Sequence, residues 1–451
     1  MHSIAFHTCL FSLLHFLVDG VCACGLMMIT CQIVSDIEAY GMIVIYDVLA
    51  FGTQPLTGRW VDTNGDSPRG LKLAMALLFG GALICILHVS WNFLFAITGI
   101  ILFGMGNSLF HVYGGKYVAM TSHNDIRVMG VFVSTGSVGL AIGLGFSNPM
   151  LLAVFILTLL ALSILHLHYA ETLIGTPSPI YLKVSKQTSQ HSAIPLLYLS
   201  CLMFVVAGRS FIGESVPTLR TSIHLMGKPL TMVMVSVIVM TGKAAGGFLS
   251  KKWGVRNVFC ASMLLSAAVF LMCPWHDAFV LITLLLINIS MPCTLYLATK
   301  AVPGREGWVF GLLAMVLMPG FLLGYLSKGN ATCQALLVPL MATILLESIL
   351  LLWMHERRWQ VLSASVVLNI FTNIPLNAFI MAYEVTSPLY IVCLECVVVA
   401  AESIGYWLVI HNWRRAFKYS FLCNSFSFLV GCIFQLMWSL VSPTHTLSFT
   451  Q

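Results

Sequence analysis

Charged residues are scarce in this sequence. Asp, Glu, Lys and Arg make up 8% of its 451 residues, whereas soluble domains carry about 25%. Hydrophobic residues make up 59%, and the mean hydropathy is +0.94. So little charge excludes an ordinary soluble protein and predicts a chain that crosses a lipid bilayer many times.

Signatures of catalysis are also missing. The sequence has no nucleophile elbow, no phosphate-binding loop and no metalloprotease helix motif. Most of its 14 cysteines lie in apolar runs, where cysteine acts as a small hydrophobic residue. The pairs Cys22/Cys24 and Cys393/Cys396 have no second pair at zinc spacing. We therefore expect no enzyme, no cofactor and no metal site.

Nucleic acid is excluded as a partner, because the net charge of +6 comes from basic residues in short loops. A cleaved signal peptide is not expected either. The first apolar stretch follows no Lys or Arg and is interrupted by Asp19. We interpret it as a retained transmembrane helix.

Apolar runs of about 20 residues recur along the chain, and in a bilayer such runs satisfy their backbone hydrogen bonds as helices. Weak alternation argues against a barrel. We predict an all-α polytopic membrane protein with about fifteen transmembrane helices. The predicted ranges are 5–28, 37–57, 70–89, 93–115, 127–146, 149–169, 194–215, 229–250, 256–274, 278–299, 307–327, 333–354, 361–383, 388–410 and 415–440.

The positions of the basic residues predict the orientation, because Lys and Arg collect in cytoplasmic loops. With a cytoplasmic N-terminus, the 22 basic residues fall on the inner side except Arg209, Arg220, Lys228 and Lys328. We therefore expect a plasma-membrane protein with a cytoplasmic N-terminus and an external C-terminus.

A long polar segment with Pro177 and Pro179 interrupts the apolar runs and predicts a cytoplasmic linker. The predicted organisation is a six-helix half over 1–170, the linker over 171–192, a second six-helix half over 193–356, and an appended three-helix module over 357–451.

A polar motif follows the second predicted helix of each half. The first copy runs from Gly58 to Gly65, and the second from Gly247 to Gly254. Each copy places a charged residue, Asp62 or Lys251, four positions after its first glycine. Internal repeats are typical of transporters.

These features resemble the major facilitator superfamily over about residues 1–354. In that family a basic residue follows the second glycine closely, whereas here residues 66–68 intervene before Arg69. The Tyr46-Asp47 pair, the Gln54-Pro55 pair and the stretch 106–111 are also similar to fosmidomycin-resistance-like exporters.

The resemblance implies secondary transport of a small solute by alternating access, with efflux as a hypothesis. It also implies that the glycine motif gates access, because Asp62 would make contacts in one access state that break in the other. The alternative is that Asp62 only caps the helix that follows it.

Ionisable residues inside predicted helices are functional candidates, because a charge near the bilayer centre costs at least about 2.5 kcal/mol. Asp19 and His15 share one face of the first helix, and Asp47 lies near the middle of the second. Arg209 and Glu214 lie in the seventh helix, the counterpart of the first. We expect a central site in which Asp19 or Asp47 binds a proton or a cation, with Arg209 as counter-ion or anion ligand.

Two alternatives stay open at this point, and Lys243 carries a separate expectation. Asp19 and Arg209 could form a permanent structural pair, since intramembrane charges often pair. His111 is expected to be a hydrogen-bonded packing residue, with a proton relay as the alternative. Lys243 is expected to extend its amino group to the inner surface.

The last three predicted helices carry polar faces. Asn369, Asn373 and Asn377 recur every four residues, and Glu395 and Glu402 are seven apart. We interpret these faces as interhelical hydrogen-bonding surfaces. A site for a small ion or a proton is the alternative.

We therefore predict a secondary transporter of a small-molecule substrate in a lipid bilayer, with proton coupling as a hypothesis. The rival is a non-transporting membrane protein that recruits or regulates another protein through its last three helices. The substrate, the direction, the coupling ion and the oligomeric state stay open.

Overall fold

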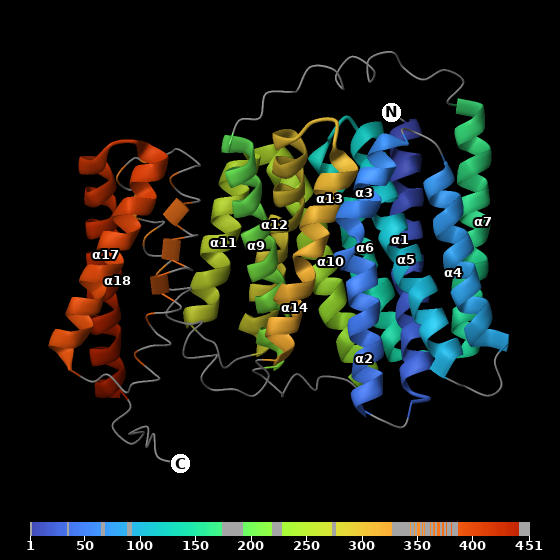
Figure 1. The fold of residues 1–451 in the computed structure, drawn as a ribbon, viewed down its shortest axis with the longest axis horizontal. Helices are drawn as coiled ribbons and strands as arrows, with labels where there is room; N and C mark the ends of the chain where they lie inside the picture. The colour runs from blue at the N-terminus through green and yellow to red at the C-terminus, as the bar shows by residue number, and fades with distance from the viewer. Residues whose placement is uncertain are drawn as a thin grey trace. The chain divides into compact units, whose positions relative to one another are not determined.

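The structure is a computed structural model (Figure 1). It describes residues 2–33, 36–64, 68–87, 93–173, 193–218, 228–272, 277–326 and 387–441, with scattered positions between 343 and 380. Two compact units divide the chain, Met1–Lys328 and Gly329–Gln451. The regular elements in the described residues are helices, without strands.

The helices of the first unit are α1 (His2–Thr30), α2 (Asp36–Asp47), the π-helix η1 (Val48–Gly52), α3 (Gln54–Thr63), α4 (Arg69–Leu87), α5 (Phe93–Thr121), α6 (Ile126–Gly145), α7 (Pro149–Leu173), α9 (Ala193–Thr218), α10 (Lys228–Trp253), α11 (Val255–Met272), α12 (Asp277–Ala301), α13 (Glu306–Met315) and α14 (Leu317–Leu326). Most of them match the predicted ranges to within a few residues. The predicted helix 37–57 is instead divided into α2, η1 and α3 and continues to Thr63, the predicted helix 307–327 is divided into α13 and α14, and α5 continues to Thr121. The first glycine motif is expected to follow a helix, but the structure places Gly58 and Asp62 within α3.

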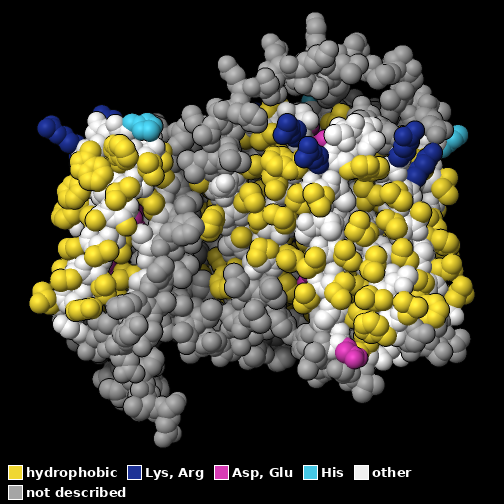
Figure 2. Space-filling view, in the orientation of Figure 1, with side chains coloured by type: hydrophobic (Ala, Val, Ile, Leu, Met, Phe, Trp, Pro, Cys, Tyr) yellow, Lys and Arg dark blue, Asp and Glu magenta, His cyan; other side chains and the backbone are white. Residues whose placement is uncertain are grey.

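Eight of the described helices are long and apolar enough to cross a membrane, and three shorter helices are also apolar. Figure 2 shows hydrophobic side chains over the described surface of the first unit, with Lys and Arg gathered at one end. Such a surface suits lipid tails rather than water. The chain is an all-α polytopic membrane protein, as predicted.

Helix α1 lies in the core of the first unit and packs along α6, α5 and α7. The contact with α6 is close because glycines face the α1 backbone. A methyl group at Gly139 would collide with the Phe16 carbonyl, and one at Gly143 with the Gly20 carbonyl. Small residues let membrane helices approach in this way. The approach brings side chains of α6 and α1 together.

Two further helix pairs, α6 with α10 and α3 with α13, join the early and late helices of the first unit. Glycines lie at both contacts. Gly130 faces the backbone of Gly247, and Gly58 faces the backbone of Gly307. The repeated motif therefore lies where the two sets of helices meet.

The second unit contains α17 (Pro388–Ile410) and α18 (Trp413–Val441), whose bounds match the prediction. Tyr406, Tyr419 and Cys423 belong to its small core. Most of the predicted helices 333–354 and 361–383 lies outside the described residues. The domain boundaries at 170, 192 and 356 stay predictions.

Candidate functional site

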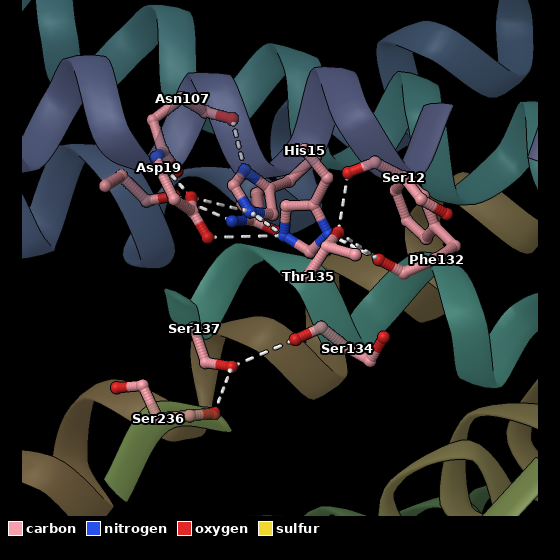
Figure 3. A network of polar contacts seen from close by, with 12 residues as sticks. Ser12, His15, Asp19, Asn107, Phe132, Ser134, Thr135, Ser137 and Ser236 are labelled. Atoms are coloured by element: carbon pink, nitrogen blue, oxygen red, sulfur yellow. Dashed lines mark hydrogen bonds and ion pairs between the residues drawn. The ribbon is translucent and has the colours of Figure 1, made fainter. Parts of the chain in front are cut away.

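A polar triad of His15, Asp19 and His111 lies within the core of the first unit. Figure 3 labels His15 and Asp19 on α1. His15 Nε2 is 3.3 Å from Asp19 Oδ2, and His111 Nε2 is 3.3 Å from Asp19 Oδ1. The two Nε2 atoms are 3.0 Å apart. Both rings are buried, and the Asp19 side chain is 17% exposed. Three titratable groups therefore converge on one point.

The other ring nitrogens identify the tautomers. His15 Nδ1 lies 2.7 Å from the Phe132 carbonyl, and His111 Nδ1 lies 3.0 Å from the Asn107 carbonyl. A carbonyl oxygen only accepts, so we assign a hydrogen to each Nδ1. In neutral rings both Nε2 lone pairs would then face each other and the Asp19 carboxylate. This arrangement is repulsive unless a proton or another cation lies among the three groups.

Neighbouring helices hold the triad in place. His15 and Asp19 are one turn apart on α1, and Asn107 on α5 donates to Asp19 Oδ1 at 3.4 Å. Gly136 on α6 faces the triad, and a methyl group there would collide with Asp19 and His15. Thr135 donates to the Ser12 carbonyl at 2.6 Å and ties α6 to α1 (Figure 3).

The triad could also hold a metal ion. Among the described residues it is the one group of at least three His, Cys, Asp or Glu side chains close enough to do so. Imidazole and carboxylate suit divalent transition metals, and a ligating histidine usually donates its other nitrogen to a carbonyl or carboxylate. Sequence spacing predicts no such group, because its members lie on two helices far apart in the chain.

Arg209 and Asp19 do not form the structural pair that sequence analysis left open. The partners of Asp19 are the two histidines and Asn107. Arg209 on α9 is 5% exposed, and it makes no hydrogen bond or ion pair with the described residues. His111 has contacts beyond packing, since its ring touches both Asp19 and His15.

The charge of Lys243 on α10 interacts with the charges of Asp19, His111 and Arg209. Lys243 is half-buried, and it makes no hydrogen bond or ion pair within the described ranges. Its expected extension to the inner surface stays a prediction. Its positive charge interacts favourably with Asp19 and unfavourably with His111.

Asp47 and Glu214 are the two other candidates. Asp47 is half-buried at the end of α2, directly before the π-helix, and forms no hydrogen bond or ion pair in the described part of the chain. The Glu214 side chain lies outside the described residues. The sequence analysis did not identify Asn107 as a hydrogen-bond donor to Asp19. Asn107 lies one turn before His111 on α5, and this spacing indicates that the two side chains share a helix face.

Asp62 caps a helix far away in the sequence. Its Oδ1 accepts from the Gly307 amide at 3.0 Å and its Oδ2 from the Trp308 amide at 2.8 Å, at the start of α13. Lys116 Nζ lies 3.6 Å from Asp62. Free amides at a helix N-terminus favour a carboxylate. The alternative that Asp62 only caps the following helix is therefore wrong.

The second copy of the motif makes a related contact. Lys251 Nζ lies 3.8 Å from Asp125, whose carboxylate caps α6 through the Arg127 amide at 3.0 Å. The Arg127 guanidinium also donates to Asp125, which holds the pKa of this carboxyl below its ordinary value despite partial burial. Gly254 ends the motif with a φ of 86°, in the region that favours glycine.

The last two candidate residues of the first motif are Gly65 and Arg69. Arg69 begins α4, and Gly65 lies outside the described residues.

In the second unit, the polar faces form buried hydrogen bonds. Asn369 donates to Glu347 at 2.6 Å, and Asn373 donates to Asn369 at 2.8 Å. Asn424 on α18 donates to Glu402 on α17 at 2.6 Å, which links the two helices. Glu395 is half-buried, and Asn377 lies outside the described residues.

No family model and no curated protein matches this chain. Its fold is similar to the crystal structure of the E. coli fucose:proton symporter FucP, with 15% identity, a TM-score of 0.51, and coverage of 72% of this chain and 92% of that chain. A second structure, of the major facilitator superfamily transporter FucP in the outward conformation, has 13% identity, a TM-score of 0.52 and the same coverage. At these identities the likeness concerns the fold: the chain has a fold similar to that of a major facilitator transporter.

Proposed function

We propose that this protein is a secondary transporter of a small solute, coupled to a proton held by His15, Asp19 and His111. The observation that carries the proposal is the approach of the two Nε2 atoms to 3.0 Å beside a carboxylate. Both Nδ1 atoms already carry hydrogens, so both Nε2 atoms and the Asp19 carboxylate offer only lone pairs to one another. One added proton on an Nε2 atom allows that nitrogen to donate a hydrogen bond to the other two groups.

Loss of that proton would leave one negative charge and two opposed lone pairs at the site. The rings would then have to move apart. His15 on α1 lies against Gly136 of α6, and His111 is carried by α5. Proton binding is thereby linked to the packing of three helices. Lys243 favours a proton over a divalent metal, because its positive charge lies within range of Asp19 and His111.

The contacts of the glycine motifs support alternating access. Asp62 with the start of α13, and Lys251 with Asp125, join the two sets of helices at polar ends of these helices. Breaking these contacts would let the halves separate there, as rigid-body movement of repeats requires. We place this end in the cytoplasm by the positive-inside rule. Reporter fusions at the two termini of the full chain test that orientation.

The direction of transport is part of the same proposal. The sequence resemblance favours efflux, whereas the structure with a similar fold is named a proton symporter. Imposing a pH gradient of either sign on loaded vesicles distinguishes the two. Symport moves solute and protons the same way, and proton-coupled efflux exchanges them.

The test uses the purified full chain in vesicles containing a pH-sensitive dye, with a panel of sugars and small carboxylates. We expect a solute-dependent proton flux that Asp19→Asn lowers at least tenfold. Asp47→Asn is the matched control and should retain the flux, because Asp47 has no contact with the triad. The proposal fails if Asp19→Asn keeps the flux, or if no solute moves protons and the wild type instead binds Zn²⁺ through the triad.

A further inference from the structure

We infer that the transported solute is a small oxyanion bound by Arg209 and Lys243, an inference that rests on the proposed transport function. Arg209 presents the first observation. Its side chain is 5% exposed, its Nη1 is shielded from solvent without a hydrogen-bond partner, and it forms no ion pair with the described residues. A guanidinium stays charged, and an unpaired charge within a membrane helix is a functional candidate by default.

The backbone around Arg209 is firmly positioned. Ser210 donates to the Leu317 carbonyl at 2.8 Å, which ties α9 to α14. A methyl group at Gly320 of α14 would collide with the Ala207 carbonyl, so the two helices are in close contact on both sides of Arg209. Its cationic group is therefore presented from a rigid base, which reduces the cost of ordering it around a ligand.

Lys243 is the second cation. It lies within electrostatic range of Arg209, and the two like charges repel each other. Asp19 is the carboxylate that interacts with Lys243 in the described part of the chain. Two positive charges thus interact with one negative charge, and a bound anion that pairs with both cations would offset their repulsion.

This charge balance links the anion to the proton. The proton on the triad cancels the charge of Asp19, so it leaves both cations without compensation and favours an anion. Because coupling between two ligands is reciprocal, a bound anion also favours the proton. A neutral sugar would leave both cations unpaired.

The planar guanidinium matches the two oxygens of a carboxylate or a phosphate, whereas the Lys243 ammonium is a point charge. The shared chemistry is that of an oxyanion. We expect one small enough to be held by two side chains, such as lactate, gluconate or inorganic phosphate.

The experiment measures binding by thermal unfolding of the purified full chain in detergent, with sodium lactate, sodium gluconate, sodium phosphate, and L-fucose as a neutral probe. Sodium chloride at equal ionic strength is the reference. At least one oxyanion should raise the unfolding midpoint by mass action, and a phosphate response distinguishes phosphates from carboxylates. Arg209→Gln and Lys243→Gln should weaken that binding at least tenfold.

Charge-preserving variants keep the test interpretable if a glutamine variant fails to fold. Lys243→Arg should keep binding within a few-fold, whereas Arg209→Lys should weaken it because the fork of two donors is lost. Asp19→Asn should bind the oxyanion at least as tightly as the wild type, because it removes the opposing negative charge.

Failure here differs from failure of the transport proposal. If fucose drives an Asp19-dependent proton flux while no oxyanion raises the midpoint above chloride, the oxyanion inference is wrong and transport stands. If an oxyanion binds through Arg209 and Lys243 and enters the vesicles without proton flux, the inference stands and the coupling proposal is wrong. Equal midpoint shifts in wild type and in Arg209→Gln would also overturn the inference.

Discussion

The absence of a Cβ atom at Gly136 allows the proton site to form. This glycine lies on α6 opposite His15 and Asp19, and its lack of a side chain lets the two polar groups lie against the helix backbone. Any Cβ at this position would occupy the space of the Asp19 carboxylate and of the His15 ring. The triad therefore depends on a residue that contributes no chemistry of its own.

Gly136→Ala should abolish solute-dependent proton flux and destabilise the protein by about 1–3 kcal/mol, the usual cost of overpacking. Vesicle flux and thermal unfolding measure the two effects. The matched control is Gly41→Ala in α2, where an added methyl group has no neighbour within 4 Å. Normal flux in Gly136→Ala would show that the triad tolerates displacement and would contradict the proposed role.

Asp125 has a pH dependence whose sign follows from its partners. Hydrogen bonds from Arg127 lower its folded-state pKa, so its stabilising contribution is complete above the unfolded pKa of about 3.9 and is lost as the pH falls through the folded value. Asp125→Asn should therefore lower the unfolding midpoint at pH 7 and make progressively less difference below about pH 4. A difference between the proteins that persists unchanged at pH 3 would contradict this assignment.

At the scale of elements, the start of α13 depends on a side chain from α3. The Asp62 carboxylate occupies both the Gly307 and the Trp308 amides, while Lys116 from α5 lies beside it. Three elements thus meet at one carboxylate. The Asp62 cap also holds α3 and α13 together, because separating the two helices leaves two amides without acceptors. We call this contact the latch.

Asp62→Ala should loosen this latch. Loss of a cap costs about 0.5–2 kcal/mol, which corresponds to roughly a 2- to 30-fold shift in the opening equilibrium. Hydrogen exchange at the Gly307 and Trp308 amides should accelerate by that factor. Glu306→Gln is the control, since Glu306 bonds only locally to the Gly304 amide in the described contacts. Unchanged exchange in Asp62→Ala would show that the latch does not limit opening.

At the scale of the whole molecule, the chain consists of two compact units with separate polar interiors. The first holds the triad and the two cations, and the second holds Glu347 and Glu402 among amide and hydroxyl donors. The rival hypothesis of a recruiting or regulating protein concerns the second unit. The role of that unit can be tested without altering the first.

Asn424→Ala removes the 2.6 Å hydrogen bond between α18 and Glu402. Leaving a buried carboxylate with fewer donors should cost about 1–3 kcal/mol. If transport belongs to the first unit, thermal stability should fall while solute-dependent proton flux in vesicles stays within twofold of the wild type. A loss of flux in protein that remains folded would assign the second unit a part in transport.

The sequence by itself determined the membrane class and the bounds of most helices, because apolar runs and their polar ends act locally. It also placed His15 beside Asp19, since four residues make one helical turn. Such features need no knowledge of which helix packs against which. For the same reason the described bounds of α1, α6 and α17 agree with prediction to within a few residues.

Only the tertiary structure decided the partners. His111 and Asn107 reach Asp19 because α5 packs on α1, and Gly136 makes room because α6 does so too. The charge of Lys243 interacts with Asp19, which lies far away in the sequence, and Asp62 caps α13 rather than α4. These contacts join residues far apart in the chain, and spacing in a single sequence carries no record of which helices approach each other.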